Sequence, residues 1–322
     1  MMNARKPVTS GLTRRAAVLA LSALPLAARA QVEGRRAWAA KVPTIRLGLL
    51  GGENDADRLM RYGAYQKLLQ DTFGVPVKII PAADYAGVIQ AFAAGQLELC
   101  YMSPAAYASA WIQSAGNVLP LLTSQEQDGT TSYVSVMYTR ADSGITSLEQ
   151  MKGRSLAWAD PNSASGYLIP RSEFRGLGLD TATYFKQTSF AGGHEQGVVA
   201  VLNHQYDAGV TWASGVGEVS EGYTRGALRA MVEKRMVNMS DLRIIWKSRP
   251  IENGPLTVRK DTPDEFRADM LAFHMALPAT HPDIYHAVDM GSSKAWVPVT
   301  HADYEVFVEM LQREASDRRK QP

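Results

Sequence analysis

Apolar segments of two different periods alternate along the chain, and this alternation constrains the fold more than any other feature. Residues 45–50 (IRLGLL) and 75–80 (VPVKII) are rich in aliphatic side chains and predict β-strands. Residues 57–72 repeat apolar side chains at helical spacing. Asp84 is placed to cap a further helix, after which residues 97–102 predict a third strand. Strands that alternate with helices are typical of an α/β fold with a largely parallel sheet.

The first thirty residues have the pattern of an export signal. Four basic residues precede an apolar run that is too short to span a bilayer, and residues 28–30 (ARA) have the spacing of a signal-peptidase site. We therefore expect a signal peptide over residues 1–30, cleaved near Ala30, and a mature protein in the periplasm. Residues 13–19 (TRRAAVL) resemble the twin-arginine export motif, with a general secretory leader as the alternative. Residues 37–39 (AWA) offer a second cleavage site.

Charge and cysteine content narrow the range of partners. The chain has 34 Lys and Arg against 32 Asp and Glu, and five of the basic residues lie in the first thirty, so the mature net charge is about −3. This balance argues against nucleic acid or an anionic membrane as a partner. Cys100 is the one cysteine, which excludes an internal disulfide and a cysteine-based metal site. We expect a soluble monomer with no cofactor and no metal.

Two segments follow the same order of residues at an offset of 109 positions. Residues 89–99 and 198–208 each contain an apolar helix, a short break with a glutamine, and the start of a strand. The strands end in small or aromatic clusters at residues 101–104 (YMSP) and 211–214 (TWAS). The pattern predicts two similar α/β lobes, with a chance match as the alternative. Because ligands bind beyond the carboxyl ends of such strands, we expect the two clusters to line one cleft.

Residues 160–170 (DPNSASGYLIP) place four small residues, two of them serines, between a strand and an apolar run. Serine accepts hydrogen bonds from the free N–H groups of a first helical turn, so the stretch predicts a helix start. It is either a plain capped helix or an anion site. The positive end of a helix binds anions, and small residues permit a close approach.

Four segments resemble those of a known family, in the family's order: 84–90 (DYAGVIQ), 160–170, 193–195 (GHE) and 245–248 (IWKS). With them the chain resembles the periplasmic phosphonate-binding proteins of ABC importers, which include phosphite and hypophosphite binders. The resemblance implies a type II periplasmic binding protein fold, with two α/β lobes joined by two hinge crossings and a ligand cleft between them. It also implies that a small phosphorus oxyanion is captured there and delivered to the membrane subunits of an ABC permease.

The resemblance, together with the pattern of strands and turns, gives expected lobe boundaries. We expect lobe 1 at residues 41–138 and 250–322, and lobe 2 at residues 139–249. The chain would cross between them near residues 138–140 and 247–255. An apolar helical pattern around Phe266 predicts a helix that packs back on lobe 1, and residues 313–322 are expected to form a solvated tail.

The family match also implies a set of ligand contacts: Ser163, Ala164, Ser165, Gly166, Tyr101, Ser103, His194, Glu195, Tyr62, Tyr133 and Trp212. Ala164 stands where the family commonly has a hydroxylic residue, so one donor is lost. His194 would donate to the oxyanion with a strength that changes near its usual pKa of about 6.5. Each of these residues also has an alternative role. The aromatic residues could pack in the core, Ser103 could cap a helix, and His194 and Glu195 could form a solvated pair.

Trp212 indicates which kind of substituent the ligand carries. Trp212 occupies the region where amine-binding relatives carry polar or acidic groups. An unsubstituted oxyanion or a short alkylphosphonate is therefore favoured over an aminoalkyl one, although Glu195 and Glu218 remain available to an ammonium group.

Two other functions stay open. A binding protein of this kind can present its ligand to a membrane sensor instead of a permease. A periplasmic serine hydrolase that uses Ser163 or Ser165 with His194 is disfavoured, because the segment lacks the first glycine of the G-x-S-x-G nucleophile elbow.

Overall fold

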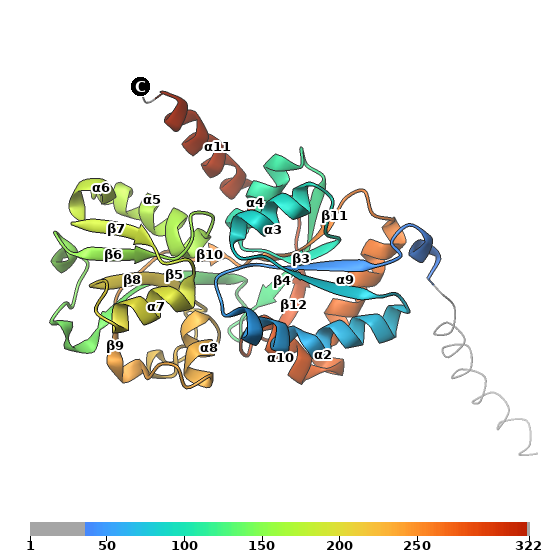
Figure 1. Cartoon of the computed structure of the whole chain (residues 1–322), viewed down its shortest axis with the longest axis horizontal. Helices are drawn as coiled ribbons and strands as arrows, with labels where there is room; N and C mark the ends of the chain where they lie inside the picture. The colour runs from blue at the N-terminus through green and yellow to red at the C-terminus, as the bar shows by residue number, and fades with distance from the viewer. Residues whose placement is uncertain (1–35, 321–322) are drawn as a thin grey trace, which may run out of the picture.

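The computed structural model describes residues 36–320, which form two α/β lobes side by side (Figure 1). The predicted signal peptide at residues 1–30 lies outside the described residues. Among the helices of residues 36–320, none has both the length and the apolar character needed to cross a membrane.

Lobe 1 is built on a six-stranded sheet in the order β12-β4-β11-β3-β1-β2. Its strands are β1 Ile45–Leu49, β2 Val77–Pro81, β3 Leu99–Tyr101, β4 Val118–Gln125, β11 Pro255–Arg259 and β12 Ala295–Pro298. β1 pairs in parallel with β2 and β3, as the alternating pattern predicts. The strands that return from the C-terminal part run antiparallel to their neighbours, β11 to β3 and β4, and β12 to β4.

The helices of lobe 1 begin and end largely where the sequence signals stand. They are α2 Asp55–Phe73, α3 Tyr85–Ala93, α4 Pro104–Gln113, α9 Asp264–Thr280, α10 Pro282–Asp289 and α11 Glu305–Lys320, with short turns at η1 Ala37–Ala40 and η7 His301–Tyr304. Asp84 caps α3 by accepting the Gly87 N–H at 2.8 Å. Phe266 lies on α9 and is buried in the lobe 1 core, as predicted. The expected tail from residue 313 is instead part of α11. The first turns of α11 pack on the body, and Glu314 pairs with Arg171 at 3.0 Å, while the end of the helix projects outward (Figure 1).

Lobe 2 has a second sheet in the order β10-β5-β8-β6-β7, with β9 also paired to β5. Its strands are β5 Ser132–Arg140, β6 Ser155–Trp158, β7 Gln187–Phe190, β8 Ala208–Ala213, β9 Leu242–Lys247 and β10 Ile251–Glu252. Its main helices are α5 Ile169–Gly176, α6 Thr181–Tyr184, α7 His194–Leu202 and α8 Ala227–Glu233, and its short turns are η2 Ala141–Ser143, η3 Glu149–Met151, η4 Ala164–Leu168, η5 Val219–Glu221 and η6 Met239–Asp241.

The first crossing between the lobes lies earlier than predicted. β5 pairs with β8 and β9 along most of its length, so residues 138–140 lie inside the lobe 2 sheet. The chain crosses between the end of β4 and the start of β5, and returns at Asn253 and Gly254 between β10 and β11. The two crossings contact each other, because Asn253 donates to the Thr131 carbonyl at 2.7 Å and to the Glu126 carboxylate at 3.0 Å.

The offset of 109 residues extends over the whole first half of each lobe. It places β1 on residues 154–158, which contain β6, and β2 on residues 186–190, which contain β7. It also places α3 on residues 194–202, the bounds of α7. The same succession of strands and helices therefore builds both lobes, and equivalent helix starts face each other across the cleft.

Candidate functional site

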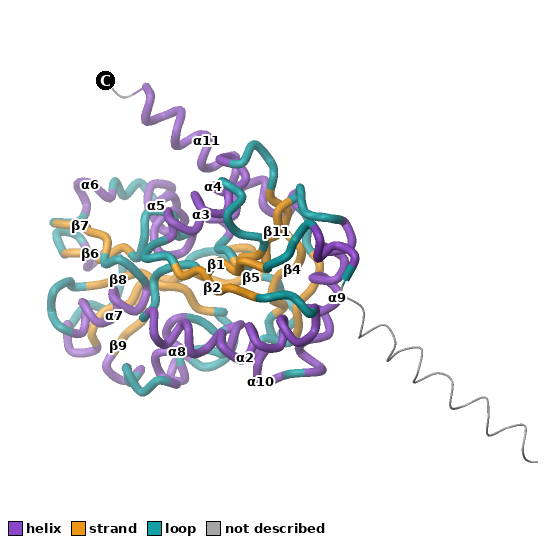
Figure 2. The backbone as a smooth tube through the Cα atoms, turned by 45° about the vertical axis from the view of Figure 1, so that its right-hand side comes forward, coloured by secondary structure: helices purple, strands orange, loops and turns teal. Residues whose placement is uncertain are grey.

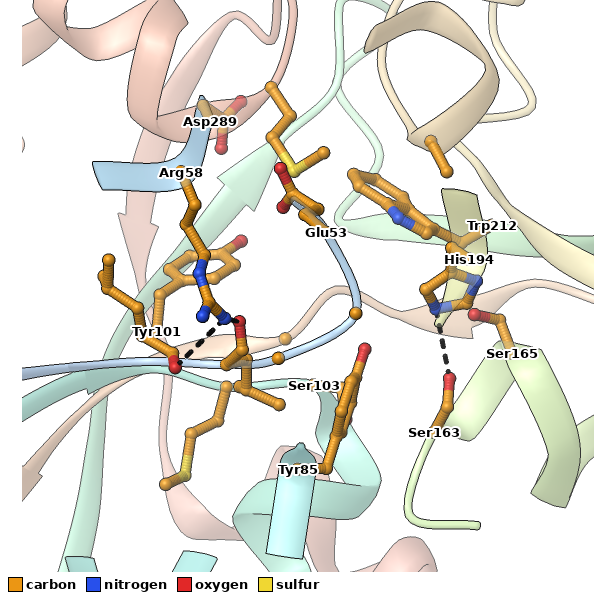
Figure 3. A pocket seen from close by; sticks show the side chains of 18 of the residues that line it. Glu53, Arg58, Tyr85, Tyr101, Ser103, Ser163, Ser165, His194, Trp212 and Asp289 are labelled. Atoms are coloured by element: carbon orange, nitrogen blue, oxygen red, sulfur yellow. Dashed lines mark hydrogen bonds between the residues drawn. The ribbon is translucent and has the colours of Figure 1, made fainter. Parts of the chain in front are cut away.

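A cavity of about 130 Å³ lies between the lobes. The predicted residues that line it are Tyr62, Tyr101, Ser103, Tyr133, Ser163, Ser165, His194, Glu195 and Trp212. Figure 3 shows the residues of lobe 2, among them Ser163, Ser165 and His194, opposite Tyr85 and Ser103 of lobe 1. Residues far apart in the sequence therefore meet at one place, and both strand-end clusters contribute to it.

The small hydroxylic segment forms a tight turn at the lobe 2 wall. Residues Ala164–Leu168 make a π-helical turn that leads into α5, and such turns occur frequently at functional sites. Ser163 caps this turn, because its Oγ accepts the Gly166 N–H at 3.0 Å. Ser163 and Ser165 are both buried and line the cavity. The predicted helix start is therefore present, and its hydroxyls lie where a ligand can reach them.

Two residues of this segment do not line the cavity. Ala164 is fully buried in an apolar cluster with residues of lobe 1, so its side chain faces the core and not the ligand space. Gly166 lies where neighbouring side chains leave no space for a Cβ atom. A Cβ there would lie 2.5 Å from the Ala159 side chain, 2.8 Å from Ser163 Oγ and 3.0 Å from His194 Cε1. A side chain at this position would therefore crowd the packing around the turn.

His194 is held on both ring nitrogens by hydroxyl groups. Nε2 lies 3.3 Å from Ser163 Oγ, and Nδ1 lies 3.0 Å from Thr211 Oγ1. Burial lowers the pKa of His194 to about 4. The imidazole is therefore neutral near pH 7, which corrects the expectation of a change in donor strength near pH 6.5.

The Ser163–His194 contact lacks the third member of a hydrolase triad. A carboxylate normally orients the histidine of such a triad and stabilises its protonated form. Here the Thr211 hydroxyl takes that place, and an imidazole with a pKa of about 4 is a weak base.

Tyr85 lines the cavity from lobe 1 and was absent from the predicted set. It is the first residue of α3, as His194 is the first residue of α7, and the two positions differ by the repeat offset of 109 residues. Burial raises the pKa of Tyr85, so its hydroxyl stays protonated and can donate. The internal repeat is the signal that could have identified this residue.

The remaining lobe 1 residues have structural partners as well as a place in the wall. Tyr101 Oη lies 2.8 Å from Ser124 Oγ, and burial raises the pKa of Tyr101 to about 12. Ser103 caps α4 by accepting the Ala106 N–H at 3.2 Å. Tyr62 is buried on α2 and packs edge-to-face against Tyr65 at 5.9 Å. The capping and packing alternatives for these residues are therefore compatible with a role in the site.

An aromatic pair closes one side of the cavity. The Tyr133 and Trp212 rings meet edge-to-face, with their centroids 6.0 Å apart. The Arg225 guanidinium lies 5.2 Å from the centre of the Trp212 ring. Arg225 is buried, and it also binds the Glu126 carboxylate and the Asn253 side chain at the two crossings. The indole is therefore held in place by a residue that is itself fixed at the hinge.

The three arginines that line the cavity all have protein partners, and sequence reasoning missed them. Arg58 donates to the carbonyls of Leu50 and, at 3.0 Å, Ala82. Arg61 and Glu53 form an ion pair of 2.8 Å, and Arg225 binds Glu126. Arg58 and Arg61 find partners eight residues away, at Leu50 and Glu53, whereas the Arg225–Glu126 pair joins residues 99 positions apart.

Glu195 lines the cavity but is engaged elsewhere. Its Oε1 lies 2.6 Å from Lys234 Nζ, and its Oε2 accepts the Asn54 N–H of lobe 1 at 3.4 Å. Glu218, the other acidic residue considered for an ammonium group, is exposed and outside the cavity lining.

Comparisons with known proteins agree on one family. Residues 48–304 match the model of the periplasmic substrate-binding proteins of phosphonate ABC transporters. A phosphate-import protein of Mycolicibacterium smegmatis is 29% identical over 81% of this chain and 83% of its own length. The phosphonates-binding periplasmic protein of Escherichia coli is 26% identical over 72% of this chain and 65% of its own length. The structure of a Prochlorococcus marinus protein in complex with methylphosphonate has the same fold, with a TM-score of 0.71 at 18% identity over 85% of this chain and 98% of that one.

Proposed function

This chain belongs to the periplasmic substrate-binding proteins of phosphonate ABC transporters, and on that premise we propose that its cleft takes up a compact phosphorus oxyanion. The observation that carries the proposal is the capped turn at Ser163 to Gly166, with its buried hydroxyls, at the wall of a small cavity. The first N–H groups of a helical turn have no acceptor within the helix and favour an anion.

Neutral donors would hold the anion. Each arginine of the lining has a carboxylate or carbonyl partner, and burial keeps His194 neutral. The neutral donors of the lining include the hydroxyls of Ser165 and Tyr85, together with backbone N–H groups. Hydrogen bonds to a charged group are about twice as strong as neutral ones, so such a set can hold an anion without a cation.

The size of the cavity favours a ligand with a small substituent. Its volume of about 130 Å³ lies below the roughly 300–1,000 Å³ typical of pockets for drug-sized ligands. Trp212 is braced by Arg225 and cannot swing away without loss of that contact. Methylphosphonate, phosphite or phosphate fits this space better than an aminoalkylphosphonate, since Glu195 is already paired with Lys234.

A calorimetric panel on the mature protein tests the proposal. It comprises phosphite, hypophosphite, methylphosphonate, 2-aminoethylphosphonate, phosphate and sulfate. We expect one of the compact phosphorus oxyanions to bind most tightly and 2-aminoethylphosphonate to bind at least tenfold more weakly. Tightest binding of 2-aminoethylphosphonate would contradict the proposed size limit, and equal or tighter binding of sulfate would contradict the phosphorus class.

We further propose that the protein is exported, that its signal peptide is cleaved near Ala30, and that it delivers its ligand to ABC permease subunits. The basic and apolar leader at residues 1–30 supports the export step, and the family supports the permease as partner. Loss of growth on the bound oxyanion as sole phosphorus source, after deletion of the gene, would distinguish import from presentation to a sensor.

A further inference from the structure

Five charged side chains gather where the two lobes meet beside the cavity. Lobe 1 contributes Glu53, Asp57 and Arg61, and lobe 2 contributes Glu195 and Lys234. Lys234 Nζ lies 2.6 Å from Glu195 Oε1 in its own lobe and 3.3 Å from Asp57 Oδ2 in the other. Lys234 directly follows α8, which lies next to the start of α2 (Figure 2). This lysine therefore bridges the two lobes.

Glu195 makes a second contact across the same boundary. Its Oε2 accepts the N–H of Asn54, the residue whose side chain caps α2 through the N–H groups of Ala56 and Asp57. A carboxylate at this end of a helix is stabilised by the helix dipole. Asn54 is also the counterpart of Ser163 at the repeat offset of 109 residues. The helix start of lobe 1 that corresponds to the proposed oxyanion site is thus occupied by a carboxylate of lobe 2.

We propose that Glu195 and Lys234 are positioning residues that hold the lobes together in the ligand-retaining form. Glu195 binds the start of α2, and Lys234 neutralises Glu195 and joins it to Asp57. The pairing also explains why Glu195, although it lines the cavity, does not need a ligand to satisfy its charge. The proposal rests on the proposed function, because a closed cleft has a use only if it retains a ligand.

The contact within lobe 2 is short, at 2.6 Å, and the two contacts across the boundary are longer, at 3.4 Å for Asn54 to Glu195 and 3.3 Å for Lys234 to Asp57. The Glu195 side chain is 4% exposed and the Lys234 side chain 25% exposed. Burial alone would lower the pKa of Lys234, but the hydrogen bonds and charge of Glu195 outweigh it, so the pKa is raised. Lys234 is therefore a charged partner for the Glu195 carboxylate near pH 7. Separation of the lobes breaks the bonds from Asn54 to Glu195 and from Lys234 to Asp57 and keeps the Glu195–Lys234 pair.

The experiment compares Lys234→Ala with Arg229→Ala and Lys234→Arg in the mature protein. Arg229 is the matched control, because it lies on α8 and pairs with Glu221 and Glu233 within lobe 2 only. We expect Lys234→Ala to lower the affinity for methylphosphonate about 3- to 10-fold. The affinity for phosphite should fall by the same factor. The loss should appear as faster dissociation in stopped-flow measurements and shrink in 0.5 M NaCl, where exposed charges are screened. Lys234→Arg should restore most of the affinity, and Arg229→Ala should match the wild type.

A readout without ligand separates this proposal from the proposed function. Hydrogen exchange of the peptide that contains Asn54 should be faster in ligand-free Lys234→Ala than in the wild type or in Arg229→Ala. Faster exchange together with no binding of any phosphorus oxyanion would overturn the proposed ligand class and leave the closure role standing. Unchanged exchange and unchanged affinity in Lys234→Ala, or a loss confined to one ligand, would overturn the closure role.

Discussion

Individual residues of the turn at Ser163 divide into those that face the ligand space and those that support it. Ser163 has two tasks, because its Oγ caps the turn and also contacts His194. The Ser165 hydroxyl lines the cavity without a capping role, while the Ser165 carbonyl accepts from Ser135 at 2.7 Å. Ala164 and Gly166 provide packing. Substitutions at neighbouring positions should therefore affect binding and stability in different proportions.

This division leads to a prediction for the two serines. Ser165→Ala should lower the affinity for the oxyanion roughly 10- to 100-fold, since hydrogen bonds to a charged group contribute about 1.5–3 kcal/mol. The free energy of unfolding in urea should stay unchanged. Ser163→Ala should weaken binding similarly and also lower the free energy of unfolding by about 1 kcal/mol, the usual loss for a helix cap. Calorimetry and urea titration measure the two effects. Wild-type affinity in both variants would mean that the segment only caps a helix.

At the scale of helices and strands, local patterns predicted most elements but not their partners. The alternation around β1, α2 and β2 follows from periodicity, and Asp84 caps α3 as its residue type suggests. Residues 132–140 form β5 of the lobe 2 sheet, and no local pattern in them indicates that sheet, so the predicted first crossing at residues 138–140 lies too late in the chain. The predicted helix start at Ser163 is present, but its first turn is π-helical and the Ala164 side chain lies in the core.

Candidate site residues with a local signature were the ones that sequence analysis could find. Ser163 and His194 lie in short motifs at helix starts. Arg225 and Lys234 owe their roles to partners many residues away, Glu126 in one case and Asp57 in the other. Such pairings form only when the lobes are assembled, and a single sequence does not indicate them.

The packing of the short turn η1 favours the earlier of the two predicted cleavage sites. Trp38 in η1 is 3% exposed, packs edge-to-face on Phe266 at 5.0 Å and donates to Asp269 at 2.8 Å. Loss of a buried tryptophan side chain costs about 3–5 kcal/mol. We expect N-terminal sequencing of the exported protein to find a start near Gln31. A protein truncated to start at Ala40 should unfold at lower urea, and equal stability of the two forms would contradict the packing argument.

At the scale of the whole molecule, each lobe buries one histidine in its neutral form. His194 lies in lobe 2 beside the cavity, and His274 lies in the lobe 1 core, where Tyr65 and the Met270 carbonyl hold its two ring nitrogens. Burial lowers the pKa of each to about 4, against about 6.5 in an unfolded chain. The two lobes therefore share one response to acid, although only one histidine belongs to the ligand site.

This response gives a prediction with a defined pH window. Between pH 6.5 and 4 the unfolded chain binds protons at both histidines while the folded protein does not, so the free energy of unfolding falls as the pH is lowered through that range. Each histidine should account for about 3 kcal/mol, since one pKa unit corresponds to about 1.4 kcal/mol. Urea titrations at pH 7, 5.5 and 4.5 on His274→Gln and His194→Gln measure it. Each variant should lose about half of the histidine-dependent fall in the free energy of unfolding. Only His194→Gln should also lower the affinity for the oxyanion. A pH dependence equal to that of the wild type in both variants would show that the buried imidazoles are not the groups that take up protons.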